Sequence, residues 1–226
     1  TAAIKGFTGR HGGTICTSSN ARRALDWAFS RGEKVLFLPD QHLGRNTAVR
    51  ELGLALEDCV VFDPHKPGGG LTPEQLRAAK MLLWKGHCSV HGRFTKASVD
   101  EVRERVPGVQ VLVHPECRHE VAEAADLVGS TEFIIATLDA APAGSKWAIG
   151  TELNLVRRLA LAHPDKTVVF LDKAVCFCST MNRIDLPHLV WALESLVRGE
   201  VVNQISVEPQ TARWAKAALD QMLALP

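Results

Sequence analysis

Short apolar runs alternate with longer amphipathic stretches along most of the chain, and this alternation restricts the fold more than any other feature. The length and apolar character of buried strands occur at 34–38, 80–84, 109–113, 146–149 and 167–171. Helical periodicity extends over 21–31, 120–127, 131–141 and 152–162. Repeated β–α order predicts an α/β protein in which helices cover both faces of parallel sheets, giving three-layer αβα domains.

The stretch 63–72 (DPHKPGGGLT) interrupts this pattern. Its glycines and prolines stop regular structure, so we expect a long loop or a domain junction there. The expected division is an α/β domain over 1–80, a second over 81–172 and a C-terminal segment over 173–226.

The two ends of the chain also carry helical patterns. The last helix is expected to present Trp191, Leu193 and Leu196. The opening stretch TAAIKGFTGR has the character of a helix interior, and its first residue is Thr1. We therefore expect the chain to be a truncated or processed form of a longer protein.

Composition excludes several classes of protein. The 226 residues carry a formal net charge of +1, which points neither to nucleic acid nor to an anionic membrane surface. Apolar runs all fall short of the roughly 20 residues that a membrane helix needs. The sequence also contains neither of the glycine-rich nucleotide motifs, GxxxxGK[ST] and GxGxxG. A cytoplasmic α/β protein is expected.

The cysteines are dispersed, which argues against a disulfide scaffold. They occupy positions 16, 59, 88, 117, 176 and 178. In a cytoplasmic protein these thiols are expected to be reduced. Cys176 and Cys178 are too close together for a zinc knuckle, and no second pair faces them. The thiols are therefore either buried or ligands brought together from distant parts of the chain.

Hydroxyl-bearing residues gather where predicted strands give way to helices, at 13–20, 129–131 and 150–152. Ligands of open parallel sheets bind beyond the carboxyl ends of the strands, facing helix N-termini. A Ser or Thr beside free backbone N–H groups suits a carboxylate or a phosphate. Plain helix capping is the alternative for each stretch, but their recurrence favours an anionic substrate.

Two other strand ends carry residues suited to catalysis. His114 and Glu116 follow the strand at 109–113, where they could act as acid and base on one ligand. The alternative is a surface turn with a capping Glu. Cys88 follows the strand at 80–84, with His91 one helical turn further along. Cys88 could be a thiolate ligand or a nucleophile, or an inert packed thiol, and the same alternatives apply to Cys178.

The chain resembles the quinolinate synthase family in motifs that span essentially its whole length and keep the same order. They lie at 39–48 (PDQHLGRNTA), 84–91 (WKGHCSVH), 113–117 (VHPEC), 129–131 (GST), 150–152 (GTE) and 178–182 (CSTMN). One such motif would be weak evidence. Their joint occurrence in order is highly specific.

This resemblance implies a fold and an activity. The family condenses iminoaspartate, supplied by L-aspartate oxidase, with dihydroxyacetone phosphate to give quinolinate, phosphate and water in de novo NAD biosynthesis. Its fold is three similar α/β domains around a pseudo-threefold axis, with the active site at the centre. A 4Fe–4S cluster is held there by three cysteines, and its remaining iron is open to act as a Lewis acid.

The resemblance also implies roles for individual residues. Cys88 and Cys178 match two cluster ligands. His114 and Glu116 match catalytic, substrate-contacting groups, with Glu116 the one expected to transfer a proton. The residues that match positions holding the anionic ends of substrate or product are Ser18 and Thr131. His91 matches a histidine close to the second cluster cysteine.

The chain departs from the family at its start. Family members carry a further upstream domain with the first cluster cysteine, and a Tyr-x-Asn segment lies just before the position of Thr1; this chain contains no Tyr. We therefore expect the third ligand to lie outside the chain, the segment 173–226 to pack on that upstream domain, and the chain to be inactive alone. Cys16, a neighbour of Ser18, is an alternative third ligand.

The remaining thiols are interpreted as structural, namely Cys59, Cys117 and Cys176. Two other functions are compatible with the same residues. One is a non-catalytic α/β module that binds a dicarboxylate or phosphate ester through Ser18, Thr131 and Thr151. The other is a different cluster-dependent hydro-lyase that shares the open-iron chemistry.

Overall fold

The computed structural model describes residues 1–173, 178 and 180–225, which form two compact units. The larger unit begins at Cys16 and contains both β-sheets, and the smaller one combines Thr1–Ile15 with the C-terminal helices. All strand pairs are parallel. The expected α/β class with parallel sheets is therefore confirmed.

The first sheet of the larger unit has the strand order β1-β3-β2. Its elements are α2 (Ala21–Phe29), β1 (Val35–Phe37), α3 (Gln41–Asn46), a π-helical turn (Thr47–Glu51), β2 (Cys59–Phe62), α4 (Pro73–Ala78) and β3 (Met81–Trp84). The central strand is β3, in which Met81 pairs with both Val35 and Cys59. Met81 and Leu83 are fully buried beneath α2 and α3.

This sheet extends past residue 80, which differs from the expected domain boundary there. The stretch 63–72 is the first part of the crossover from β2 to β3, followed directly by α4. A parallel pair of strands requires such a crossover connection. The glycines and prolines of 63–72 therefore belong to a loop that connects two strands of the same sheet, and do not separate two domains.

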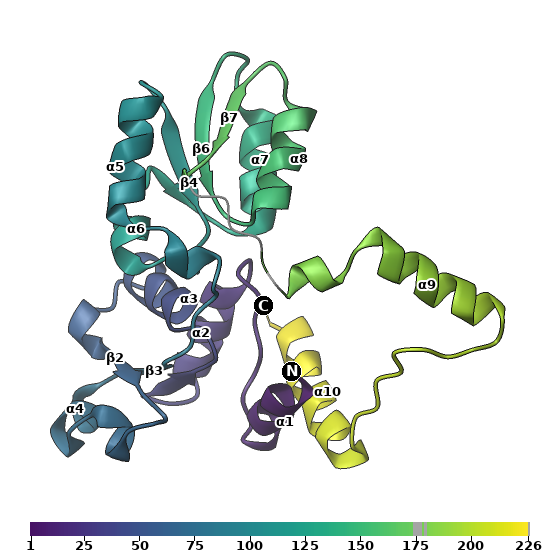
Figure 1. The fold of residues 1–226 in the computed structure, drawn as a ribbon. Helices are drawn as coiled ribbons and strands as arrows, with labels where there is room; N and C mark the ends of the chain where they lie inside the picture. The colour runs from purple at the N-terminus through teal and green to yellow at the C-terminus, as the bar shows by residue number, and fades with distance from the viewer. Residues whose placement is uncertain (174–177, 179, 226) are drawn as a thin grey trace. The chain divides into compact units, whose positions relative to one another are not determined.

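The second sheet has the order β5-β4-β6-β7. Its elements are α5 (Lys96–Arg105), β4 (Gln110–Val113), α6 (His119–Ala124), β5 (Leu127–Val128), α7 (Thr131–Ala140), β6 (Lys146–Gly150), α8 (Leu153–Ala162) and β7 (Thr167–Phe170). Figure 1 shows α5 and α6 on one face of this sheet and α7 and α8 on the other.

Both faces of the second sheet are buried, as a three-layer domain requires. Successive side chains of a strand point to opposite faces. Val111 of β4 accordingly packs with Val102 of α5, whereas Leu112 packs with Ile134 of α7 and Leu159 of α8. Because both faces of β4 are buried, its consecutive residues Val111, Leu112 and Val113 are all apolar.

The smaller unit consists of helices. They are α1 (Ala2–Arg10), α9 (Leu186–Val197) and α10 (Pro209–Leu223). Helix α1 lies directly against α10, because Gly6 and Gly9 of α1 carry no side chain where Thr211 and Trp214 of α10 approach. Helix α9 was expected to be the last helix, which is wrong, since α10 follows it.

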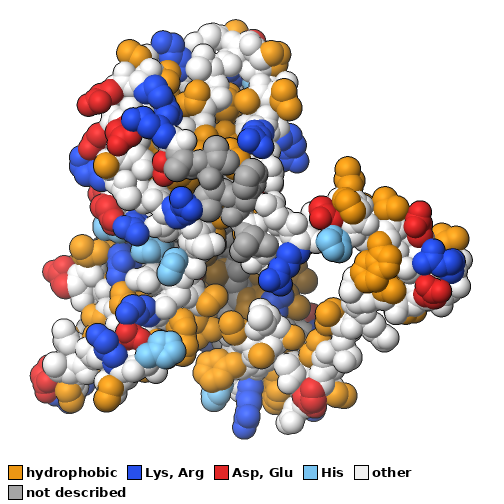
Figure 2. Space-filling model, in the orientation of Figure 1, with side chains coloured by type: hydrophobic (Ala, Val, Ile, Leu, Met, Phe, Trp, Pro, Cys, Tyr) orange, Lys and Arg blue, Asp and Glu red, His pale blue; other side chains and the backbone are white. Residues whose placement is uncertain are grey.

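Helix α9 carries an exposed apolar surface. It is visible as clustered hydrophobic side chains over α9 in Figure 2. The exposed residues, several of which recur at helical spacing, are Leu186, Leu189, Val190, Trp191, Leu193, Leu196 and Val197. A helix that is apolar around most of its circumference is usually buried in an assembled protein.

Short 3₁₀ turns occur at Leu56–Asp58, Pro67–Gly70, His91–Arg93 and Met181–Arg183. Every strand expected from the apolar runs is present. Some elements were not predicted from the sequence, namely the strands β2 and β5 and the helices α3, α4, α5 and α10. Among the described residues, no helix combines the length and the apolar character needed to cross a membrane.

Candidate active site

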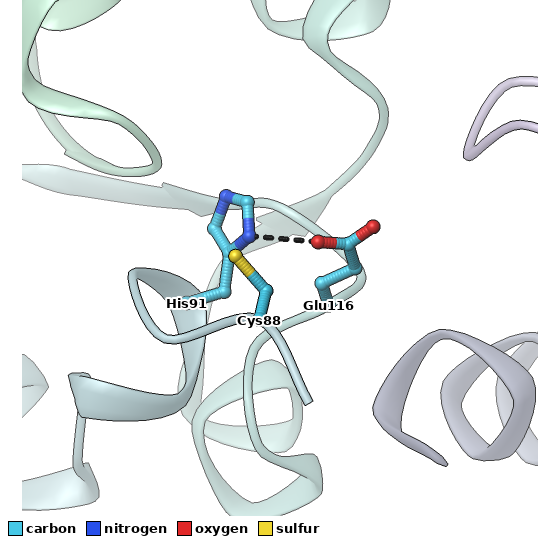
Figure 3. A group of neighbouring side chains, drawn as sticks. All are labelled: Cys88, His91 and Glu116. Atoms are coloured by element: carbon cyan, nitrogen blue, oxygen red, sulfur yellow. Dashed lines mark hydrogen bonds and ion pairs between the residues drawn. The ribbon is translucent and has the colours of Figure 1, made fainter. Parts of the chain in front are cut away.

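Two loops of the larger unit meet at the carboxyl ends of their strands. The loop after β3 carries Cys88 and leads to His91, and the turn after β4 carries Glu116. Figure 3 shows the three side chains converging, and their ligand-type atoms all lie within 4.8 Å of one another. A thiol, an imidazole and a carboxylate thus share one point, contributed by two different sheets.

His91 is the centre of this group. It is buried, and its Nδ1 lies 3.0 Å from Oε2 of Glu116 while its Nε2 lies 3.1 Å from Oγ1 of Thr151. Burial by itself lowers the pKa of His91, but hydrogen bonds and charge attraction from Cys88 and Glu116 outweigh it and raise the pKa to about 9. The ring is therefore a cation at neutral pH, and both of its nitrogens donate.

The two acidic neighbours of His91 respond in the opposite direction. Burial raises the pKa of the Cys88 thiol, but hydrogen bonding and charge attraction from His91 more than compensate and lower it. Burial likewise raises the pKa of Glu116, but the hydrogen bond and the charge of His91 outweigh burial and lower it. The site thus holds a thiol prone to ionise and a carboxylate, both in contact with one imidazolium.

His114 differs from His91 in its charge. Burial, followed by the nearby positive charge of His91, lowers the pKa of His114 to about 4, so its ring is neutral. Its Nδ1 accepts a hydrogen bond from the backbone N–H of Glu116 at 3.3 Å. The proton therefore resides on Nε2, which donates to Oγ of Ser18 at 3.2 Å. The Ser18 hydroxyl proton remains available for an acceptor.

Ser18 and Thr131, both expected at the anionic ends of a substrate, line the same open pocket of about 380 Å3. Ser130 at its edge caps α7 by accepting from the N–H of Phe133 at 3.2 Å, so plain capping applies to that hydroxyl. Thr131 is the first residue of α7 and is exposed. Glu132 also lines the pocket, which makes this wall partly acidic.

The other two hydroxyl-rich helix starts serve different purposes. Glu152 caps α8 by accepting from the N–H groups of Asn154 and Leu155. Its neighbour Thr151 instead contacts His91. At the start of α2, the N-cap residue Asn20 turns its side chain toward the N–H of Thr17, 2.7 Å away.

The expected cluster ligands fall in separate units. Cys88 belongs to the larger unit and Cys178 to the smaller one, where its Sγ accepts from the N–H of Met181 at 3.4 Å. Cys176 lies outside the described residues. The thiol of Cys16 is half-buried, and burial followed by the charge of Glu116 raises its pKa to about 11. That shift opposes the thiolate form that a ligand needs.

Burial also raises the pKa of two other thiols, those of Cys59 and Cys117. Cys59 lies in the core of the first sheet, and burial raises its pKa to about 11. Cys117 is fully buried, its Sγ lies 3.5 Å from the carbonyl oxygen of Gly150, and burial raises its pKa well above the ordinary value. Neither thiol has the lowered pKa that distinguishes Cys88.

Sequence reasoning overlooked Asp40, Asn46 and the contact of Thr151. Asp40 accepts a hydrogen bond from the N–H of Cys88 at 2.9 Å, and Asn46 donates to the carbonyl oxygens on either side of Glu116. A usable signal existed for Asp40, because it follows β1 at a strand end and begins a helix. Asn46 shows no such signal, since a buried amide inside a helix is recognisable only from its partners.

Comparison with known proteins agrees with this arrangement. A family model described as quinolinate synthetase A protein matches residues 1–224. The chain is 74% identical to the quinolinate synthase of Streptomyces coelicolor over all of its length and 58% of that protein's. It is 68% identical to the quinolinate synthase of a Nocardioides species, again over its whole length and 59% of the relative.

A more distant relative, the quinolinate synthase of Geobacillus kaustophilus, is 56% identical over the whole chain and 61% of the relative's length. The chain thus spans about three-fifths of the curated relatives that it matches. The range that the family model matches includes both strand-end loops of the site. On this evidence the chain belongs to the quinolinate synthase family.

Proposed function

We propose that this chain supplies much of the active site of a quinolinate synthase. In this reaction iminoaspartate and dihydroxyacetone phosphate condense to quinolinate, phosphate and water, a step of NAD biosynthesis. The observation that carries the proposal is the convergence of Cys88, His91 and Glu116 within 4.8 Å, beside a neutral His114 that donates to Ser18. Such a site offers a metal ligand, a base and a hydrogen-bond donor together.

Glu116 is proposed as the group that accepts protons from substrate. Its pKa is lowered, with the contact to His91 outweighing burial, so the carboxylate is ionised and ready at neutral pH. The hydrogen bond from His91 to Oε2 of Glu116 orients the carboxylate. His114 presents its Nε2–H toward Ser18, so the Ser18 hydroxyl can donate its own proton to a substrate carboxylate or phosphate oxygen. Thr131, which lines the same pocket as Ser18, is proposed to contact an anionic end of the substrate as well.

A 4Fe–4S cluster is the proposed cofactor, with Cys88 and Cys178 as two of its ligands. When bound, such a cluster supplies an open iron that acts as a Lewis acid in dehydration. The donor chemistry of Cys88 fits this role, because its thiol is half-buried and its pKa is lowered. A third cysteine would come from the part of the relatives that this chain does not span.

The proposed setting follows from the same family. We propose that the chain contributes two of three α/β domains arranged around a pseudo-threefold axis, and that the segment 173–226 packs on the remaining domain. The exposed apolar surface of α9 supports that packing. A cytoplasmic location and L-aspartate oxidase as the supplier of iminoaspartate complete the proposal, with neither nucleic acid nor membrane as a partner.

Anaerobic iron and sulfide analysis with a visible spectrum tests the proposal. It is applied to this chain and to a protein extended to the full length of the relatives, together with an assay for quinolinate. We expect only the extended protein to bind about four irons and form quinolinate. Cys88→Ser or Cys178→Ser in the extended protein should abolish cluster binding, whereas Cys59→Ala should not.

Two outcomes would redirect the proposal. An extended protein that stays colourless but binds a dicarboxylate through Ser18 and Thr131 would indicate a non-catalytic binding module. A coloured protein that dehydrates other substrates without forming quinolinate would indicate a different hydro-lyase. Normal turnover by the 226-residue chain alone would contradict the expectation that it is inactive.

A further inference from the structure

Asn46 connects the first sheet to the turn that carries Glu116. It is the last residue of α3, and its side chain is 2% exposed. Its Nδ2 donates to the carbonyl oxygens of Pro115 and Cys117, both at 2.8 Å, and its Oδ1 lies 2.9 Å from Nδ1 of His119. Both amide hydrogens and the amide oxygen are thus used, and the two carbonyls flank Glu116 directly.

Asp40 makes the corresponding connection at the other end of the same helix. Its Oδ1 caps α3 by accepting from the N–H groups of His42 and Leu43. Its Oδ2 accepts from the N–H of Cys88 at 2.9 Å. In addition, the N–H of Gln41 donates to the carbonyl oxygen of Gly86 at 3.0 Å. The start of α3 therefore holds the loop of Cys88 by two hydrogen bonds.

Between these ends, α3 is fixed to the first sheet. Leu43 is buried in the core, and a side chain at Gly44 would meet Phe37 of β1 and Leu83 of β3 at 2.7 to 2.8 Å. The absence of a side chain at Gly44 lets the helix lie close to those strands. After Asn46 the chain continues as the π-helical turn, a local rearrangement that is frequent at functional sites.

We propose that α3 is a clamp, with Asp40 and Asn46 as positioning residues that set the Cys88 loop and the Glu116 turn in register. The two loops come from different sheets, so sheet hydrogen bonds do not determine the separation between the thiol and the carboxylate. A helix of fixed length, bonded to one loop at each end, constrains it, together with the direct contacts of His91 with Glu116 and of Arg118 with the carbonyl oxygen of Gly92. The catalytic meaning of the clamp rests on the proposed function, but its existence does not.

Hydrogen exchange of the 226-residue chain tests the clamp without requiring turnover. In Asn46→Ala, the amides of Glu116 and Cys117 should exchange about tenfold faster or more, because the carbonyls of Pro115 and Cys117 lose a buried donor. The amides of β4 should keep their protection. Thr47→Val is the matched control, since Thr47 is equally buried on the next residue and its Oγ1 has no partner among the described residues.

A second arm examines the opposite end. In Asp40→Asn the side chain keeps its size, but a single amide oxygen cannot serve both the cap and the Cys88 N–H. We expect the Cys88 amide to exchange faster while the amides of Glu116 and Cys117 change less. If Asn46→Ala fails to fold, His119→Ala provides the test at a half-buried position, with a smaller increase at the same turn.

Proton NMR distinguishes a change in the relative position of the two loops from a general loss of stability. The rings of His91 and His114 stack with centroids 4.3 Å apart, one ring following the Cys88 loop and the other preceding Glu116. Their ring-current shifts in proton NMR should therefore decrease in Asn46→Ala and remain unchanged in Thr47→Val.

The proposal is overturned if Asn46→Ala leaves both the exchange of the Glu116 and Cys117 amides and the ring-current shifts unchanged. It is equally overturned if β4 loses as much protection as the turn, since Asn46 would then support the whole sheet. Absence of quinolinate formation in an extended protein would instead contradict the proposed function and leave these measurements intact.

Discussion

The imidazole of His91 lies flat on that of His114, with ring centroids 4.3 Å apart and planes inclined by 14°. The two rings have opposite proton preferences. Glu116 and Cys88 hold a proton on His91, while burial and the charge of His91 exclude one from His114. A second positive charge at this distance would be repelled, so the pair carries a single charge at neutral pH.

The first prediction concerns this pair in the metal-free chain. Nitrogen-15 NMR at pH 7 should find both nitrogens of His91 protonated and His114 neutral with its proton on Nε2. Glu116→Gln, which keeps the side-chain volume, should lower the pKa of His91 because the carboxylate charge is removed. A charged His114 at pH 7, or a proton on its Nδ1, would contradict the assignment of the Ser18 contact.

The second prediction concerns metal binding by the group of Cys88, His91 and Glu116. Anaerobic addition of Co²⁺ to the chain should displace a proton from His91 and produce a thiolate-to-metal charge-transfer band, because the three ligand atoms lie within 4.8 Å of one another. Cys88→Ser should remove the band, and Glu116→Gln should weaken binding about tenfold or more. Cys59→Ala should change neither, since Cys59 lies in the core of the first sheet. A band that persists in Cys88→Ser would place the metal elsewhere.

The third prediction concerns acid sensitivity through His42. Burial, then the positive charges of Arg45 and His87, lower the pKa of His42 to about 4 from the ordinary 6.5. The unfolded chain therefore binds this proton more readily than the folded one. The stability contributed by neutral His42 is complete above pH 6.5 and is lost as the pH falls toward 4.

Urea unfolding between pH 4 and 7 measures this effect. His42→Phe should flatten the fall in the unfolding midpoint on acidification, because its ring takes up no proton. The exposed His65→Gln is the control and should retain the wild-type slope. Equal slopes in wild type and His42→Phe would show that other groups cause the acid sensitivity.

The fourth prediction concerns the packing of α1 on α10. A methyl group at Gly9 would collide with the backbone carbonyl of Trp214, which cannot move without displacing α10. Gly9→Ala should therefore destabilise the smaller unit by about 1–3 kcal/mol, as overpacked sites do. Trp fluorescence during chemical denaturation reports this change. Gly32→Ala, where a methyl group meets nothing within 4 Å, should be neutral or slightly stabilising. Equal stability of both variants would contradict the close packing.

The local pattern of residues was enough to predict the α/β class and much of the site. Apolar runs such as the one ending at Val113 indicate strands buried on both faces, and that burial implies parallel sheets covered by helices. Because ligands bind beyond the carboxyl ends of such strands, Cys88 and Glu116 could be singled out before any partner was known. Family motifs then attached specific roles to these positions.

What periodicity could not reveal was the choice of partners. The periodicity of apolar residues indicates which residues of a strand are buried but not which strands lie beside it. The domain division depends on such neighbours, because β3 lies between β1 and β2 and pairs with both. The helix α10 was missed because alanine-rich surfaces such as that around Ala215 and Ala218 carry a weak apolar signal, and its packing depends on Gly9 of a distant helix.

The sequence by itself therefore determined the sheet class, the strand ends and the chemical types of the site residues, because those follow from local burial and composition. Tertiary structure alone decided that His91 bridges Glu116 and Thr151, and that Asn46 reaches Pro115 across 69 positions of the chain. Such contacts join groups far apart in sequence. They exist only because packing of the two sheets leaves buried polar groups that must find hydrogen-bond partners in space.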